Sequence, residues 1–175
     1  MHIGANGEVR EFDFYDAVIC SHGRLTYEQV QAHLDYASAL PVAPSKAKPV
    51  ARSVASLAKL HAAFRSARAR RGGLDFETRE GVIELTDGHV TSVNRVQRLT
   101  AHQIIEEAMI NANVCAARFI EGAEQCSLYR VHEAPDAMKL EELNQDLRSV
   151  GLRLLKGVPE PKVFKDLLDL SLIHI

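Results

Sequence analysis

The alternation of apolar and polar residues predicts several short strands along the chain. Strand-like segments at 1–3 and 8–21 flank Asn6-Gly7, and segments at 82–85 and 90–93 flank Asp87-Gly88. Both dipeptides favour tight hairpins, because glycine, asparagine and aspartate adopt positive φ more readily than other residues. Segments 74–76 and 127–132 are also rich in residues that favour strands. We therefore expect antiparallel hairpins.

Helical spacing of apolar residues predicts longer elements between these strands. Thr26 can cap one helix, and a second is expected from residue 50 to about 70, after a proline-containing loop whose last breaker is Pro49. Gly72-Gly73 is expected to end the second helix. The strongest helical pattern covers about 101–121, with an apolar stripe so broad that we expect burial on most sides.

Two further helices are expected after Asp136, which can cap the first, and from Pro161. Strands and helices thus interleave. The predicted fold class is α+β (mixed), with antiparallel hairpins packed with helices and a long buried helix at about 101–121.

Length and composition indicate one domain of ordinary globular character. The chain has 175 residues, a net charge of −2 and 46% hydrophobic residues. No apolar run approaches the roughly 18 residues that a membrane-spanning helix needs. The three cysteines, Cys20, Cys115 and Cys126, are widely spaced, which fits a reducing cytoplasm. We expect a cytoplasmic protein without membrane contact.

Both ends of the sequence look unlike those of a complete protein. The first strand has only about three residues, and an isolated hairpin is marginally stable, so we expect it to belong to a larger sheet. Residues 170–175 form an abrupt apolar tail that resembles the translation of a sequencing-adaptor end. We therefore expect a partial domain at 1–169 and a non-native tail at 170–175.

Residues 41–73 carry the strongest charge asymmetry in the chain. They contain eight Lys or Arg residues and no Asp or Glu: Lys46, Lys48, Arg52, Lys59, Arg65, Arg68, Arg70 and Arg71. A solvated helix face is one interpretation, although such faces usually mix both signs. Contact with a polyanion is the other, because each cation placed against a phosphate releases counterions.

Two residues outside this stretch are candidates for ligand contact. Glu106 lies in the apolar helical segment, where a carboxylate either pairs with an arginine or accepts hydrogen bonds from ligand hydroxyls such as those of ribose. Phe76 follows the basic stretch, where an aromatic ring either joins the core or stacks on bases. Neither alternative is decided by spacing alone.

Motifs for the common catalytic chemistries are absent from the sequence. It contains no nucleophile elbow, no glycine-rich phosphate loop and no pair of histidines with zinc-ligand spacing. It also lacks a closely spaced Asp cluster that could hold two metal ions for phosphoryl attack. We predict no catalytic residue and no metal site in this chain.

Four ordered motifs resemble the RNB catalytic domain of the ribonuclease II and R family. They are SHGRLTY at 21–27, RRGGLDFE at 70–77, IIEEAMINAN at 104–113 and LYRVHE at 128–133. The resemblance implies a processive, magnesium-dependent hydrolase that degrades single-stranded RNA from its 3′ end to 5′-mononucleotides. It also implies that Phe76 clamps stacked bases, that Tyr27 contacts the 3′-terminal nucleotides and that Glu106 helps to recognise ribose.

The chain also departs from the family pattern. The metal-binding Asp cluster, a second clamping aromatic, a catalytic arginine and the flanking oligonucleotide-binding barrels have no counterpart here. The resemblance therefore implies that magnesium is bound by the remainder of a parent polypeptide and that this chain alone is inactive.

Three interpretations remain. They are an exoribonuclease fragment with Arg65, Arg68, Arg70 and Arg71 as phosphate contacts, a non-catalytic RNA-binding module, and a structural or protein-interaction domain.

Overall fold

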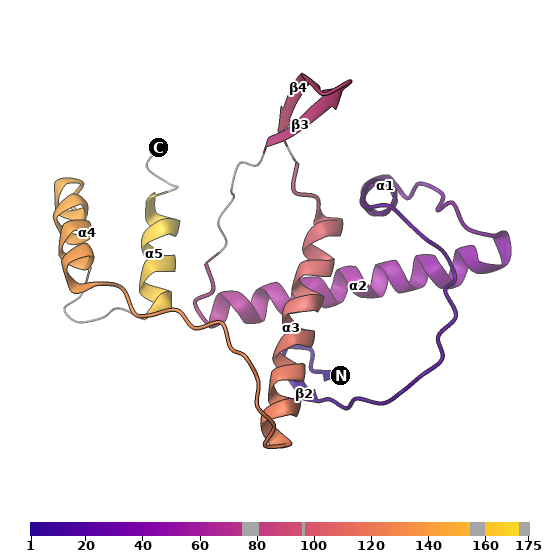
Figure 1. The fold of residues 1–175 in the computed structure, drawn as a ribbon, viewed down its shortest axis with the longest axis horizontal. Coiled ribbons are helices and arrows are strands. Elements are labelled where there is room, and N and C mark those ends of the chain that lie inside the picture. The colour runs from indigo at the N-terminus through magenta and orange to yellow at the C-terminus, as the bar shows by residue number, and fades with distance from the viewer. Residues whose placement is uncertain (75–80, 96, 155–159, 172–175) are drawn as a thin grey trace. The chain divides into compact units, whose positions relative to one another are not determined.

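A computed structural model describes residues 1–74, 81–95, 97–154 and 160–171, as shown in Figure 1. Within these ranges it has five helices and two antiparallel two-stranded sheets, which confirms the mixed α+β class. The elements in chain order are β1 His2–Ile3, β2 Val9–Glu11, α1 Tyr27–Tyr36, α2 Pro44–Arg70, β3 Gly81–Thr86, β4 His89–Arg95, α3 Thr100–Gly122, α4 Ala137–Ser149 and α5 Pro161–Ser171.

The chain is divided into two compact units. The first contains Met1–Ser66 and Phe76–Arg118, and the second contains Ala67–Asp75 and Phe119–Ile175. Helices α2 and α3 each begin in the first unit and end in the second. Both sheets and α1 therefore belong to the first unit, whereas α4 and α5 belong to the second.

The core of the first unit is built on one face of α2 and one face of α3. Val54, His61 and Phe64 are buried on α2, and their spacing of seven and three residues places them on one side of the helix. The turn between β1 and β2 packs against this helix, because a Cβ added at Gly7 would lie 2.1 Å from the carbonyl oxygen of Ala63. Gly7 has φ +78°, so both conformation and space require glycine there.

Helix α3 confirms the predicted bounds but corrects the predicted burial. Its buried residues are Ala101, Ile104, Glu107 and Cys115, which is one face and not most of the surface. Ile105 and Met109 are 49% and 53% exposed. Gly122 is the last residue of the helix, and Glu124, with φ 53°, adopts a left-handed conformation two residues later.

The second predicted hairpin is confirmed. Strands β3 and β4 pair antiparallel around Asp87 and Gly88, whose φ values of 49° and 79° suit a tight two-residue turn. Its apolar side chains remain exposed, including Ile83 at 59% and Val93 at 68%. The predicted segment 74–76 extends beyond the described residues after Leu74.

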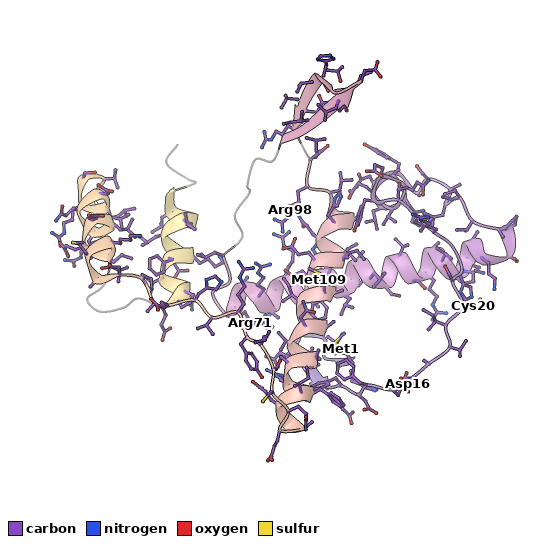
Figure 2. The ribbon with its side chains drawn as sticks, viewed as in Figure 1. Met1, Asp16, Cys20, Arg71, Arg98 and Met109 are labelled. Carbon is purple, nitrogen blue, oxygen red and sulfur yellow. The ribbon has the colours of Figure 1, made fainter. Side chains whose placement is uncertain are left out.

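Two predicted strands are largely wrong. Of segment 8–21, only Val9–Glu11 forms a strand, and Figure 2 shows Asp16 and Cys20 on irregular backbone. Segment 127–132 has no strand, and Leu128 and Val131 are 102% and 79% exposed. Strand-forming residues need a partner strand to satisfy their backbone groups, and residue type alone cannot supply one.

Helix α2 begins earlier than predicted. Pro44 is its first residue and Pro49 lies inside it, whereas the sequence analysis placed both in a loop. The start is a tight turn in which the Lys46 N–H donates to the Ala43 carbonyl at 2.8 Å. Proline suits a first helical position, and Pro49 removes only one backbone donor from a helix of 27 residues.

The second unit confirms three predicted helix signals. Gly72, with φ +78°, follows the end of α2, and the N–H groups of Gly72 and Gly73 donate to Ala69 and Arg68. Asp136 caps α4 by accepting from the Met138 N–H at 2.7 Å. Helix α5 begins at Pro161 as predicted. Among the described residues, no helix has the length and apolar character needed to cross a membrane.

Candidate functional site

Tyr27 is positioned by the start of α1. Thr26 caps this helix, and its hydroxyl accepts from the Gln29 N–H at 3.3 Å while the Gln29 side chain accepts from the Thr26 N–H at 2.9 Å. This reciprocal capping box fixes where the helix begins. Tyr27 is consequently the first residue of α1, with 42% of its surface exposed.

The ring of Tyr27 stacks on the ring of His102 in the first turn of α3. The ring centroids are 4.1 Å apart and the planes are inclined by 28°. Nδ1 of His102 accepts a hydrogen bond from the Leu99 N–H at 3.2 Å. The imidazole is thus held at one ring nitrogen by the backbone and on one face by Tyr27.

A second contact joins the same two helices. The side-chain oxygen of Gln31 accepts from the Ala101 N–H at 3.1 Å, and the amide nitrogen of Gln31 donates to Asp35 at 2.9 and 3.0 Å. The first N–H groups of a helix have no partner within it, so Gln31 supplies an acceptor where α3 needs one. Two residues of α1 therefore bind the first turn of α3.

Glu106 is accessible and not buried as the sequence analysis assumed. Its side chain is 34% exposed, and Oε2 lies 2.7 Å from Nη2 of Arg98. Figure 2 shows Arg98 immediately before α3. The sequence left open whether Glu106 pairs with an arginine, and it does. The buried carboxylate of this segment is its neighbour Glu107, at 5% exposure.

Helical spacing brings Tyr27 and Glu106 to one part of the molecule. His102 and Glu106 are four residues apart on α3, so their side chains are neighbours on one face. Tyr27 stacks on the first, and Arg98 pairs with the second. We call Tyr27, Arg98, His102 and Glu106 the α3 cluster. Phe76, the third predicted contact, lies outside the described residues.

An apolar cavity of about 220 Å³ lies beside Tyr27, within the first unit. Val54 and Leu57 of α2 and Ile104 of α3 contribute to it, together with Leu25, Thr26, Tyr27, Val30, Ala101 and Ile105. Tyr27 therefore lines an apolar cavity and also stacks on His102 of the α3 cluster.

The electrostatics of this region favour the ionised form of Glu28, the neighbour of Tyr27. A hydrogen bond from its own backbone lowers the pKa of Glu28, and the Thr26 hydroxyl lowers it further. Slight burial opposes these effects without reversing them. Glu28, at the start of α1, therefore stays ionised to a lower pH than an ordinary glutamate.

The four predicted phosphate contacts differ in their surroundings. Arg65 lies in the first unit and is exposed, whereas Arg68, Arg70 and Arg71 lie in the second. Arg68 is half-buried, and its Nη2 donates to the Leu74 carbonyl at 3.3 Å. Arg70 and Arg71 are exposed, and Figure 2 shows Arg71 at the end of α2.

The sequence motifs did not point to His102, Arg98 or Gln31 as site residues. His102 had one available signal, its spacing of four residues before Glu106. Arg98 lies outside a regular element, and the partner of Gln31 lies far from it in sequence. No local pattern marks such contacts.

The described residues do not fit a metal centre. No group of three or more His, Cys, Asp or Glu side chains comes together among them in a way that could hold a metal ion.

Comparison with known proteins decides the family. The RNB domain family matches residues 1–175. This chain belongs to the RNB domain family. The RNB chain is 34% identical to ribonuclease R of Escherichia coli over 171 residues, which is 97% of this chain and 21% of that protein. It is 35% identical to ribonuclease R of Vibrio parahaemolyticus over 169 residues, with coverage of 95% and 20%.

A solved structure shares the fold of the RNB chain. Mycoplasma genitalium RNase R, determined in complex with ribose-methylated single-stranded RNA, aligns with a TM-score of 0.82 at 23% identity, covering 95% of this chain and 26% of that one. The RNB chain thus spans about a fifth of the length of the curated relatives that it matches.

Proposed function

We propose that this RNB chain is the RNA-holding part of a 3′→5′ exoribonuclease that hydrolyses single-stranded RNA to 5′-mononucleotides. The observation that supports it is the α3 cluster, in which an aromatic ring and an accessible carboxylate from distant parts of the sequence are held together. The family membership, the ribonuclease R relatives and the RNA-bound structural neighbour support the same function.

Tyr27 and Glu106 have complementary roles in this proposal. The exposed part of the Tyr27 ring offers a flat apolar surface to a nucleotide near the 3′ end, since every nucleotide has such a surface. Glu106 accepts a hydrogen bond from a ribose 2′-hydroxyl, which is the group that distinguishes RNA from DNA. Arg98 orients the carboxylate through a bond of 2.7 Å.

The remaining predicted contacts act on features that all strands share. Arg65, Arg68, Arg70 and Arg71 would contact phosphates, and Phe76 would clamp stacked bases. These contacts give affinity without distinguishing RNA from DNA. Selectivity between the two is therefore assigned to Glu106, with Tyr27 holding the nucleotide against it.

Hydrolysis is assigned to other parts of a longer polypeptide. In-line attack on a phosphodiester needs metal-bound carboxylates, and such a set would have to come from outside the residues present here. We expect the purified chain to release no mononucleotides from single-stranded RNA in magnesium. Magnesium-dependent release by the pure chain, abolished by a chelator, would contradict this assignment.

Binding of labelled oligonucleotides tests the proposal directly. Fluorescence anisotropy would give the affinity of the full chain for a single-stranded RNA and for the DNA of the same sequence. We expect RNA to bind more tightly, and Glu106→Gln to remove most of that preference, roughly tenfold for a lost bond to a charged acceptor. Tyr27→Ala should weaken RNA binding as well.

A matched control separates this effect from loss of a salt bridge in general. Glu141 pairs with Arg148 on α4 at 3.4 Å, and its side chain is 54% exposed. Glu141→Gln should leave the RNA-to-DNA affinity ratio unchanged. Equal binding of RNA and DNA by the wild-type chain would overturn the proposed function.

A further inference from the structure

We propose that His102 is a positioning residue that holds Tyr27 in register with Glu106 and thereby sets the preference for RNA over DNA. This inference rests on the proposed function, because it concerns how the same site reads ribose. It assigns a role to a residue that no sequence motif singled out.

Tyr27 needs an external support to keep one orientation. It is the first residue of α1, it follows the irregular segment 12–26, and it is 42% exposed. A tyrosine in such a position can sample several rotamers unless a neighbour restricts it. His102 supplies that restriction, since the two rings stack at 4.1 Å with an inclination of 28°.

His102 is itself held from its own backbone. Its Nδ1 accepts from the Leu99 N–H at 3.2 Å, which fixes the plane of the imidazole and leaves the proton of the neutral ring on Nε2. The ring is half-buried. The support for Tyr27 is therefore anchored in the start of α3 and does not depend on another mobile side chain.

The position of His102 on α3 places the stacked Tyr27 ring relative to Glu106. Glu106 is one helical turn further along the same face and is held by Arg98 at 2.7 Å. A nucleotide that rests on Tyr27 and donates its 2′-hydroxyl to Glu106 needs a fixed separation between ring and carboxylate. His102 and Glu106 share one rigid helix, so stacking on His102 sets that separation. Loosening Tyr27 should reduce RNA binding more than DNA binding.

The alternative is that His102 only fills space between α1 and α3. Three substitutions separate the two roles. His102→Phe keeps an aromatic ring for Tyr27 but removes the acceptor for Leu99. His102→Asn keeps a polar side chain without the ring, and His102→Ala removes both. Gln103→Ala, at the next position of α3, is the matched control.

The experiment measures RNA and DNA affinity of the full chain for each variant by anisotropy. We expect His102→Ala and His102→Asn to lower RNA affinity roughly three- to tenfold, the value of one aromatic pair, with DNA affinity within twofold of wild type. We expect His102→Phe to restore the RNA preference and Gln103→Ala to leave it unchanged. A wild-type RNA-to-DNA ratio in both His102→Ala and His102→Asn would overturn the inference.

A spectroscopic measurement covers the case in which a variant folds poorly. In the wild-type chain with ¹³C-labelled tyrosine, assigned through Tyr27→Phe, the Tyr27 ring signals should carry an upfield shift from the imidazole. The shift should persist, and the signal should broaden less, when RNA is added. If the wild-type chain shows no cross-peak between the ring signals of Tyr27 and His102, the inference is also overturned.

The two proposals can fail separately. If Tyr27→Ala and Glu106→Gln leave the RNA-to-DNA ratio unchanged, the proposed function fails. If these two variants lower the ratio and the His102 variants do not, only the positioning role fails.

Discussion

The side-chain oxygen of Gln31 accepts a hydrogen bond from the backbone N–H of Ala101 at 3.1 Å. This bond joins α1 to the first turn of α3 and satisfies a helix donor that has no partner in its own helix. The relationship resembles a helix cap, with the difference that the capping side chain comes from another helix.

Replacing Gln31 by alanine should therefore destabilise the fold. We expect the free energy of unfolding to fall by about 1–2 kcal/mol, the usual cost of losing a cap at a partly buried helix start. Urea denaturation followed by circular dichroism measures it. Gln145→Ala, on the exposed surface of α4, should change stability by less than about 0.5 kcal/mol. Equal effects at both positions would show that the bond to Ala101 contributes nothing.

Arg98→Ala should weaken RNA binding with little effect on stability. The pair with Glu106 is about one-third exposed, so we expect it to contribute no more than about 1 kcal/mol to folding. Loss of orientation at the carboxylate should lower RNA affinity roughly fivefold, and Arg98→Lys should restore it only in part because lysine lacks the planar fork. Arg148→Ala, which breaks the pair on α4, serves as control and should leave RNA affinity unchanged.

Arg71→Gln should weaken the binding of RNA and the binding of DNA by the same factor. Arg71 is exposed at the end of α2, and a phosphate contact there would not distinguish the two strands. The slope of log affinity against log salt should decrease in magnitude by about 0.7, the value for one contact with a single strand. The measurement is a salt titration of both oligonucleotides, with Lys139→Gln on α4 as control. A slope identical to that of wild type would remove Arg71 from the binding surface.

Gly72→Ala should destabilise the second unit. Gly72 has φ +78°, and a Cβ there would lie 2.5 Å from the backbone nitrogen of Lys162 at the start of α5. Strain and steric overlap act together, so we expect a loss of more than about 1 kcal/mol. Gly151→Ala tests strain alone, because its φ is also +78° but no atom lies within 4 Å of the added Cβ. Gly72→Ala should have the larger effect in urea denaturation.

Glu28 should contribute to stability only in its ionised form. Its pKa is lowered below the ordinary value of 4.5 in the folded chain, so the unfolded chain binds the proton more tightly. The contribution is complete above pH 4.5 and is lost as the pH falls through the lower folded value. Glu28→Gln should therefore reduce the loss of stability on acidification, as read from urea midpoints at pH 7 and pH 3. Glu142→Gln on α4 is the control.

Signals that act within a few residues predicted local structure well. Thr26 and Asp136 cap the helices expected of them, and Asp87-Gly88 forms the expected turn, because the relevant bonds span two or three residues. The strand predicted at 127–132 failed for the opposite reason, since a strand requires a partner chosen by the whole fold.

The candidate site also combines features that local patterns predict with features that depend on the whole fold. The motifs predict Tyr27 and Glu106 as contact residues, which stays a prediction, but the burial assigned to Glu106 was wrong, because the pattern did not indicate which of two adjacent acids faces the core. The stacking of Tyr27 on His102 joins residues from different helices, and apolar periodicity carries no information on such a pair.

The burial of Cys115 has a practical consequence. Cys115 is 1% exposed on α3, whereas Cys20 and Cys126 are exposed. A thiol reagent should therefore label two cysteines at once, and the third only when the helix around it opens. In a chain carrying serine at positions 20 and 126, the labelling rate would report the opening of this helix without any added probe, and bound RNA that clamps the first turns of α3 would slow it.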